Sequence, residues 1–262
     1  MAAVLASWCV AAVSAAGPAA PAPAISAPKE FPLKEVKLIR VSADSGSIIV
    51  RGGKGDKARV TVVGSLDSCV IVTEVRGADL VVEAKHKFMK TCAAGFAVEA
   101  AGDLPVRVYA GSGDIEIVSR RAAVEADAGS GDIIVKQAAG DLTLRSGSGD
   151  IKAEASASNA KAQSGSGKVE LTRLLGSASV MTGSGDIRLE WARPPQTGTA
   201  EVKSGSGNVD LVFPKGTRLA SSVRTGTGSS SNELGDTPGA EWRVSVMSGT
   251  GNVRIRRPDP KK

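Results

Sequence analysis

The sequence predicts an all-β fold, a single-chain parallel β-solenoid (β-helix or β-roll-like) of about seven coils of 18–23 residues, with two short strands per coil. Three observations predict it. A Gly-Ser-Gly-Asp-Ile motif recurs at a nearly fixed spacing, columns of apolar residues keep their distance from each motif, and aromatic residues make up only 3% of the chain. A core of Val, Ile, Leu and Ala suits thin, regular layers.

The motif has four identical copies, and variants or decayed copies that begin at Gly165, Gly205, Gly226 and Gly249. The spacing from one first glycine to the next is 18, 18, 18, 18, 22, 21 and 23 residues. We expect each copy to form a tight corner, where glycine tolerates close packing and positive φ and the aspartate accepts hydrogen bonds from nearby amides. The predicted corner residues of the identical copies are Gly111, Asp114, Gly129, Asp132, Gly147, Asp150, Gly183 and Asp186.

Gly-Ser-Gly also occurs in phosphate-binding loops. Those loops run into the N-terminus of a helix and usually end in Lys-Ser/Thr. Every copy here runs into a predicted strand, which favours the structural corner.

Four apolar columns lie five and three residues before each first glycine, and four and six residues after it. Alternation within each pair predicts two strands whose inward faces share one narrow core. The outward column at plus five alternates in sign from Lys152 to Asp210, with Arg254 following after the decayed copy. Opposite charges on neighbouring coils are favourable when the coils stack in register.

The rest of the chain divides by composition. Residues 1–16 are mostly small and apolar and predict a signal peptide, and 17–30 are Ala/Pro-rich and predict a disordered linker. Residues 31–105 predict irregular β coils or a cap, 106–257 the regular solenoid, and 258–262 a basic tail. No later apolar run reaches the length of a transmembrane span. We therefore expect an exported protein that is periplasmic, cell-surface or extracellular.

Export would leave Cys69 and Cys92 as a pair, which predicts one disulfide. His86, the only histidine, lies near them in sequence, but one His and two Cys make a poor metal set. The prediction is therefore a cystine and an exposed histidine, with no metal site.

The extra residues of the later coils all fall between the first and second strand of a coil. Insertions confined to one turn project from one edge of a solenoid, which is often its binding face. This edge gives the candidate ligand-binding residues, which are Trp191, Arg193, Lys215, Arg218 and Trp242. The alternative for the two tryptophans is that they cover the end of the core. The net charge of +6 is compatible with an anionic polymer as partner.

No cofactor is predicted, and calcium stays a minor alternative. Calcium-binding β-rolls have similar coils, but here the aspartate directly precedes the apolar residue and Lys168 interrupts the aspartate column. Catalytic motifs such as a nucleophile elbow or HExxH do not occur, so we predict no enzyme. The alternative is a polysaccharide-active β-helix enzyme.

The repeated Ser-Gly-Ser-Gly-Asp-Ile/Val, preceded by Ala101-Gly102-Asp103-Leu104-Pro105-Val106, resembles the bacterial putative-adhesin β-strand-repeat domain, a family of unknown function. The resemblance covers roughly Val36 to Arg256. It implies an exported surface or envelope protein and brings no catalytic residues. We therefore expect a non-catalytic, adhesin-like interaction scaffold whose partner is a cell-envelope or extracellular component rather than nucleic acid. The oligomeric state is not predicted.

Overall fold

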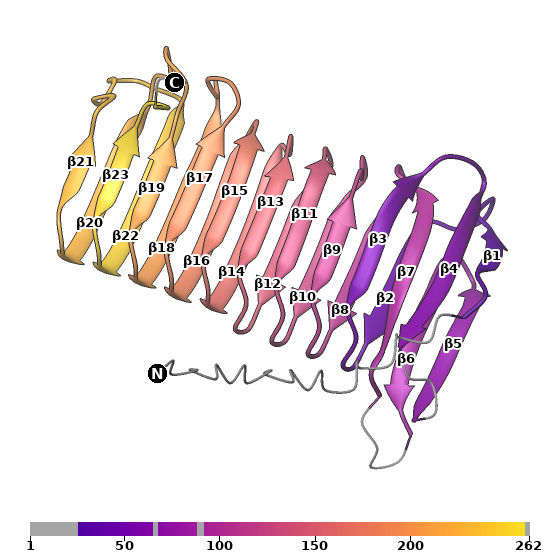
Figure 1. Ribbon diagram of the computed structural model, residues 1–262. Coiled ribbons are helices and arrows are strands. Elements are labelled where there is room, and N and C mark those ends of the chain that lie inside the picture. The colour runs from indigo at the N-terminus through magenta and orange to yellow at the C-terminus, as the bar shows by residue number, and fades with distance from the viewer. Residues whose placement is uncertain (1–25, 65–67, 88–91, 260–262) are drawn as a thin grey trace, which may run out of the picture.

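The computed structural model describes residues 26–64, 68–87 and 92–259, and none of these residues lies in a helix (Figure 1). The strands form two sheets that face each other. In spatial order, sheet A contains β1 (Lys29–Pro32), β4 (Lys57–Gly64), β7 (Ala94–Ala101), β3 (Ile48–Gly53), β9 (Ile115–Val118), β11 (Ile133–Ala138), β13 (Ile151–Ala155), β15 (Val169–Leu174), β17 (Ile187–Trp191), β19 (Val209–Val212), β23 (Val253–Arg256) and β21 (Ser230–Asn232). Sheet B contains β20 (Ala220–Thr227), β22 (Trp242–Thr250), β18 (Gly198–Ser206), β16 (Ser177–Ser184), β14 (Asn159–Ser166), β12 (Leu142–Ser146), β10 (Val124–Ala128), β8 (Val106–Ala110), β2 (Leu38–Ala43), β6 (Asp79–His86) and β5 (Cys69–Arg76).

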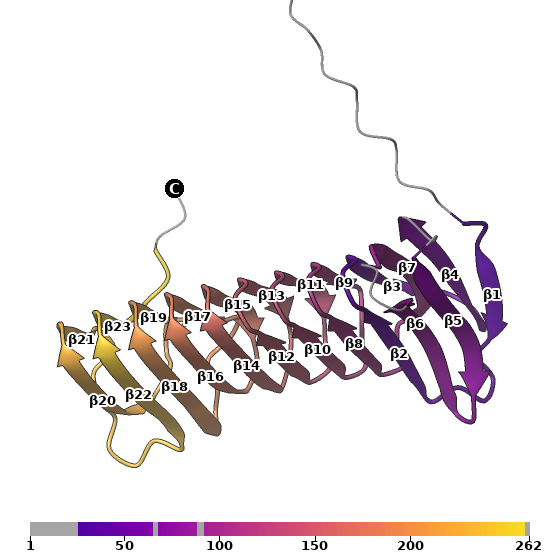
Figure 2. The ribbon, with the colours of Figure 1, turned by 90° about the horizontal axis from the view of Figure 1, so that it is seen from below.

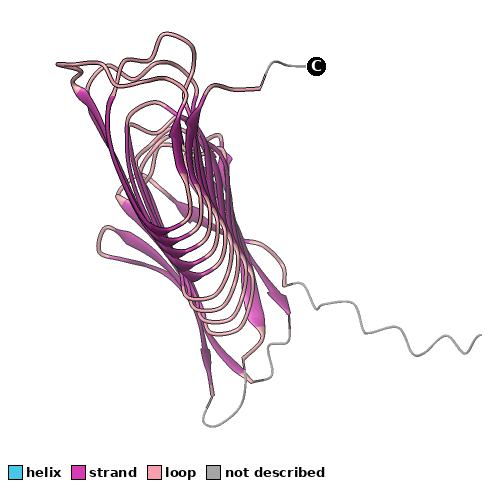
Figure 3. Ribbon diagram, turned by 90° about the vertical axis from the view of Figure 1, so that its left-hand side faces the viewer, coloured by secondary structure: helices cyan, strands magenta, loops and turns pink. Residues whose placement is uncertain are grey.

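The predicted β-solenoid is confirmed. In each regular coil a strand of sheet B runs into a Gly-Ser-Gly corner, and a strand of sheet A leaves it. Consecutive coils pair in parallel and in register, so that Val124 lies beside Val106 and Leu142, and Ile133 beside Ile115 and Ile151. Figure 3 shows the flattened coils end-on, with the core between the two sheets.

The core consists of the predicted apolar columns. Ile115 and Ile117 on sheet A are fully buried, as are Val108 and Ala126 on sheet B. Because the side chains of a strand point alternately to its two faces, the intervening residues face solvent. Two-residue periodicity therefore accounts for the two-sheet core.

The chain order is rearranged at the C-terminal end. The last two strands, β22 and β23, lie between β18–β19 and β20–β21 (Figure 2). The decayed copy of the motif therefore belongs to the coil at the physical end of the solenoid, and Arg254 lies directly beside Asp210. The sign alternation of the plus-five column consequently continues without a break.

The terminal coil has polar residues at core positions. Ser221 and Asn232 stand where interior coils carry apolar side chains, and the Asn232 side-chain amide donates to the Ser221 hydroxyl at 3.2 Å. The Ser221 hydroxyl in turn donates to Asp236 at 2.8 Å. A polar last layer can face water without exposing the apolar core, so the decay of the motif is an end cap.

The N-terminal end is also rearranged. The parallel stack continues beyond β8–β9 through β2–β3 to β6–β7, which makes it longer than the predicted seven coils. Beyond it, β4 and β5 pair antiparallel to β7 and β6, and β1 pairs antiparallel to β4. Antiparallel strands at the edge end the parallel register, as a solenoid cap should.

Some sequence boundaries need correction. The predicted linker ended at residue 30, but Lys29 and Glu30 already belong to β1 and pair with β4. The predicted signal peptide and the rest of the linker up to residue 25 lie outside the described residues, as do Lys261 and Lys262 of the basic tail. A disulfide joins Cys69 and Cys92, as predicted, and ties β5 to the segment before β7.

Candidate functional site

The glycines of the corners are required by close approach between coils. A Cβ on Gly149 would lie 2.1 Å from the carbonyl oxygen of Gly131 in the preceding coil, and one on Gly147 would lie 2.2 Å from that of Gly129. These glycines do not have positive φ, whereas the equivalents of Gly149 in the later coils, Gly185, Gly207, Gly228 and Gly251, have φ between 132° and 148°. Absence of a side chain, more than left-handed backbone, explains the repeat of glycine at the corners.

The corner aspartates form a ladder between coils. Oδ1 of Asp132 accepts the backbone N–H of Asp150 at 2.8 Å, and Oδ1 of Asp150 accepts that of Lys168 at 2.7 Å. Asn208 takes the same role toward Asn252 at 3.1 Å. The aspartates thus accept amides, as predicted, but the amides belong to the neighbouring coil.

A column of small hydroxyl residues is buried just before each later corner. The Ser146 hydroxyl donates to the Gly131 carbonyl at 2.9 Å and accepts the Gly149 N–H at 2.8 Å. In the same way Ser164 donates to the Gly149 carbonyl and Thr182 to the Gly167 carbonyl, each in the corner of the preceding coil. These bonds join a strand of sheet B to the corner of the preceding coil.

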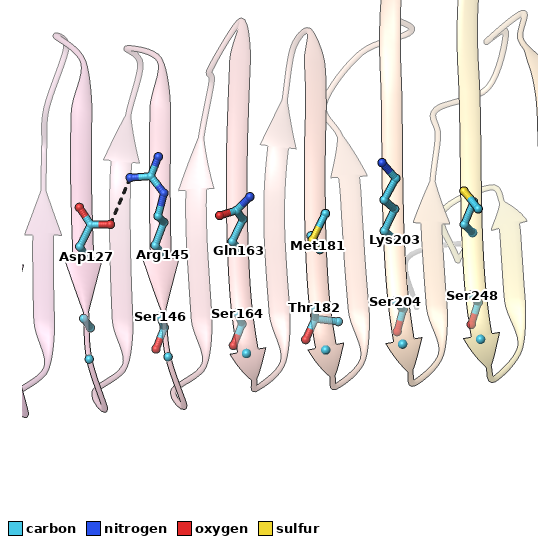
Figure 4. A pocket seen from close by; sticks show the side chains of 18 of the residues that line it. Asp127, Arg145, Ser146, Gln163, Ser164, Met181, Thr182, Lys203, Ser204 and Ser248 are labelled. Carbon is cyan, nitrogen blue, oxygen red and sulfur yellow. Dashed lines mark hydrogen bonds and ion pairs between the residues drawn. The ribbon is translucent and has the colours of Figure 1, made fainter.

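A groove of about 1180 Å³ runs along the outer face of sheet B beside these corners (Figure 4). Its floor is the column of first glycines, and one wall is the column two residues before them. In spatial order that wall contains Tyr109, Asp127, Arg145, Gln163, Met181, Lys203, Met247 and Arg224. The groove exists because the glycines lack side chains while their neighbours on the same face have long ones.

The wall carries the large exposed apolar side chains of the regular coils. Tyr109 is 51% exposed, Met181 45% and Met247 48%, and the other large apolar residues of comparable exposure are in the cap, on β5. Exposed apolar side chains gathered along one groove mark a ligand or partner surface more often than scattered ones do. This column is therefore the best candidate site in the described part of the chain.

The charges of the groove are unevenly distributed. Asp127 is its acidic lining residue and receives a hydrogen bond from Arg145 at 3.2 Å. Lys203 pairs with Glu201, which lies outside the groove lining, at 2.7 Å. Arg224 makes no ion pair with any described residue. The end of the groove at β20 is therefore the positive one.

The predicted long-turn edge lies at the opposite edge of the solenoid from the corners (Figure 1). Arg193, Lys215 and Arg218 are exposed there, as predicted. Arg218 lines a hollow of about 260 Å³ together with Glu241. Whether these residues bind a ligand stays a prediction.

The placement of the two tryptophans contradicts the expectation that they contact a ligand. Trp191 and Trp242 are 2% and 0% exposed and form a cluster with Phe213 inside the coil. The rings of Trp191 and Phe213 stack at 4.3 Å, and Trp242 meets Trp191 edge-on at 5.8 Å. The wider long turns leave more interior volume, and the aromatic rings fill it.

The next feature is the arrangement of possible metal-ligating side chains in the described residues. They contain no group of three or more His, Cys, Asp or Glu side chains that could hold a metal ion. The corner aspartates already bond to amides, and His86 is exposed with its Nδ1 2.8 Å from Asp44.

Arg120 is a buried charge outside the groove. Its guanidinium donates to the carbonyls of Ala100 at 3.1 Å and of Leu104, at the crossing from β7 to β8. Burial lowers the pKa of Arg120 to about 10, against the opposing effect of Asp103. These bonds fix the crossing connection and give Arg120 a structural role.

β23 ends in an arginine whose side chain is mostly buried. Arg256 is 16% exposed on its side chain and bonds Asp210 at 2.8 Å. That bond holds the pKa of Arg256 above its ordinary value, against the effect of burial. Arg256 therefore belongs to the ionic layer on sheet A.

Sequence reasoning missed the groove. The available signal was the column two residues before each glycine, in which one tyrosine and two methionines interrupt polar residues on an outward face. The residue type in this column varies from coil to coil, as it does on an ordinary solvent-exposed surface. The column is recognised as the wall of a groove only once the structure places the glycine floor beside it.

With this architecture and groove established, comparison with known proteins decides the family. The model of the Toastrack DUF4097 family matches residues 36–256. The chain belongs to this family. The match spans the parallel coils and nearly all of the cap, so the Toastrack domain includes both rearranged ends.

Solved structures are similar to this chain at low sequence identity. A putative adhesin from Bacteroides fragilis is 14% identical with a TM-score of 0.54, and the match covers 90% of this chain and 97% of that chain. A putative adhesin and a putative lipid binding protein, both from Parabacteroides distasonis, give TM-scores of 0.47 and 0.49, identities of 11% and 13%, and coverage of 88% and 91% of this chain, and of 97% and 98% of theirs. Comparison with curated protein sequences finds no match. At 14% identity, the likeness to the Bacteroides fragilis structure establishes the fold alone.

None of the described residues forms a helix long and apolar enough to cross a membrane.

Proposed function

We propose that this Toastrack chain is an exported, non-catalytic interaction scaffold of the bacterial cell envelope or surface, and that the groove beside the glycine corners is its binding face. The observation that carries the proposal is the groove itself, which continues across eight strands of sheet B from β8 to β20. A rigid stack of parallel strands holds such a surface in place without needing to close around a ligand.

The chemistry of the groove favours binding over catalysis. Its ionisable lining residues are Tyr109, Asp127, Arg145, Lys203 and Arg224, and the acidic one is engaged by an arginine. A hydrolase or lyase needs an acid and a base placed around one reacting bond. The competing functions, a polysaccharide-active β-helix enzyme and a calcium-stabilised β-roll, lack an equivalent observation.

The long-turn edge is the second candidate surface. Arg193, Lys215 and Arg218 present three cations on neighbouring turns, and Arg218 borders a hollow. Such a surface suits an anionic envelope polymer or an acidic protein.

Co-sedimentation of the full chain with a washed bacterial envelope fraction tests the proposal. A groove variant, Met181→Glu with Met247→Glu, should lose sedimentation, whereas Arg193→Glu with Lys215→Glu and Arg218→Glu should retain it. The reverse outcome would assign binding to the long-turn edge. Release of new sugar ends from the envelope fraction during incubation would establish the enzyme alternative instead.

A further inference from the structure

We propose that the groove binds a long-chain fatty acid anion, with its acyl chain along the glycine floor and its carboxylate at Arg224. The inference rests on the proposed function and names the ligand class of the same groove. It follows from what the floor, the wall and the charged end can each contact.

The floor offers a ligand almost no hydrogen-bonding capacity. The N–H of Gly147 donates to the Ala128 carbonyl at 2.9 Å, and its own carbonyl accepts the Ser166 N–H at 3.2 Å. The N–H of Gly129, in the same floor, donates to the Ala110 carbonyl at 2.8 Å. The strand ladder runs along the groove, so it uses these groups between coils and leaves C–H groups on the surface.

A hydrogen-bonding ligand would therefore lose bonds to water without replacing them. A sugar or a peptide carries many polar groups, and each one that is desolvated without a partner opposes binding. An acyl chain has none to lose, and it gains from every part of its surface that leaves water. The floor thus favours a hydrocarbon over a glycan or an extended peptide.

The wall supplies matching apolar contacts. Met181 and Met247 are unbranched thioethers that adapt to an irregular chain, and Lys203, which stands between them, can lay its aliphatic stem beside the ligand. Seven strand spacings of about 4.8 Å separate β8 from β20, which gives a groove about 34 Å long. The groove is therefore linear and long, as an extended acyl chain requires.

The positive charge at the β20 end of the groove determines which head group the ligand carries and in which direction the ligand lies. Arg224 lies at the last strand of the groove and makes no ion pair with any described residue, while the acidic lining residue Asp127 lies near the other end and bonds to Arg145. A carboxylate at Arg224 would place the chain over Met247 and then Met181. A neutral or cationic head would leave this arginine without a partner.

Calorimetric titration of the full chain with sodium palmitate below its micellar concentration is the direct test. We expect saturable binding at one site. Octanoate, which has the same head and a shorter chain, should bind more than about tenfold more weakly, because each buried CH₂ contributes to affinity. Monopalmitin has the same acyl chain and no charge. Comparison of its affinity with that of palmitate therefore gives the contribution of the carboxylate.

Two variants assign the site. Met181→Gln with Met247→Gln should weaken palmitate binding about tenfold. Met181→Leu with Met247→Leu should retain it, and Val75→Gln, an exposed apolar side chain on β5, should have no effect. Arg224→Glu should weaken palmitate about threefold and leave monopalmitin unchanged, since the loss is that of a solvent-exposed ion pair. Unfolding midpoints equal to the native one show that each variant is folded.

No saturable uptake of palmitate, or equal affinities for native protein and the glutamine double variant, would overturn the proposal. Binding only to phospholipid vesicles, or only to an envelope polysaccharide, would overturn it as well. If envelope sedimentation still depended on Met181 and Met247 in those cases, the groove would remain the binding face with another ligand. Loss of that dependence would remove the proposed function itself.

Discussion

The carboxylate of Asp150 accepts the backbone N–H of Lys168 at 2.7 Å, so one side chain joins two coils at their corners. In other coils the Asp132 N–H donates to the Asp114 carboxylate, and the Asn208 N–H donates to the Asp186 carboxylate. Each bond is exposed to solvent, so each contributes modestly. They recur along the corner edge where an aspartate or asparagine occupies this position, and Lys168 interrupts the series.

Asp150→Ala should lower the free energy of unfolding by about 1 kcal/mol, because it removes one acceptor that water can partly replace. Asp150→Asn should be nearly neutral, since Asn208 accepts the equivalent amide of Asn252. Urea unfolding measures both. If the asparagine variant were as unstable as the alanine variant, the carboxylate charge beside Lys168 would be the stabilising element.

Gly149→Ala should destabilise the chain by at least about 3 kcal/mol, because the new methyl group would force apart two packed backbones. The contact is with the Gly131 carbonyl oxygen, 2.1 Å from the built Cβ. Ser148→Ala, at the exposed neighbouring position, is the matched control and should change little. Equal midpoints for the two variants would show that the corners can spread without cost.

The aromatic cluster allows a paired comparison. Trp191→Phe should cost more than Trp242→Phe, because the Trp191 indole N–H donates to the Gly176 carbonyl at 2.9 Å while that of Trp242 has no acceptor among the described residues. We expect a difference of about 1 kcal/mol in chemical unfolding. A larger loss at Trp242 would mean that ring packing outweighs the hydrogen bond.

Removal of the disulfide should destabilise the N-terminal cap. Cys69 and Cys92 are 23 residues apart, and a loop of this size stabilises a fold by about 3 kcal/mol in the chain-entropy description. Cys69→Ser with Cys92→Ser should reproduce the effect of a reducing agent on the native chain. A native chain whose unfolding is unchanged by reduction would contradict this.

The ion pair of Glu116 predicts a pH dependence. The hydrogen bond from Lys136 at 2.8 Å, assisted by its charge, holds the pKa of Glu116 below the ordinary 4.5 despite partial burial. A carboxyl whose pKa is lower in the folded state stabilises the fold above its unfolded pKa, and this stabilisation is lost as pH falls through the folded value. Lys136→Met should therefore flatten the stability curve below pH 4.5. Parallel curves for the two proteins would exclude this pair as a contributor.

The repeat predicted the coil well because the same core position recurs in every coil, so many residues report on it. Ile115, Ile133 and Ile151 occupy one column, and such agreement leaves little freedom for the interior of the solenoid. The order of the ends could not be obtained in this way, because Val246 is as suitable a neighbour for Val202 as Val223 is. Ser221 and Asn232 are polar residues in columns that are apolar elsewhere. They are the sequence feature that marks the coil at the end of the solenoid.

The site was less predictable than the fold. Trp191 and Trp242 are flanked by loops in sequence, yet a wide coil needs large side chains inside, and they are buried. The groove depends on the missing side chains of the first glycines, and only the stacking of the coils shows that these glycines form one continuous floor. Local sequence thus specified the corner, and three-dimensional stacking turned it into a surface.

β22 and β23 come last in the chain, but in the stack they lie between the interior coils and the terminal strands β20 and β21. This order restricts how the solenoid can change its length. Copying the last segment of the gene would not extend the solenoid, because that segment does not lie at its end. New repeats can enter only among the interior coils, where each sequence neighbour is also a spatial neighbour. Longer and shorter relatives should therefore differ by whole interior coils and share both crossings, and the groove would lengthen or shorten with them, by one glycine at a time.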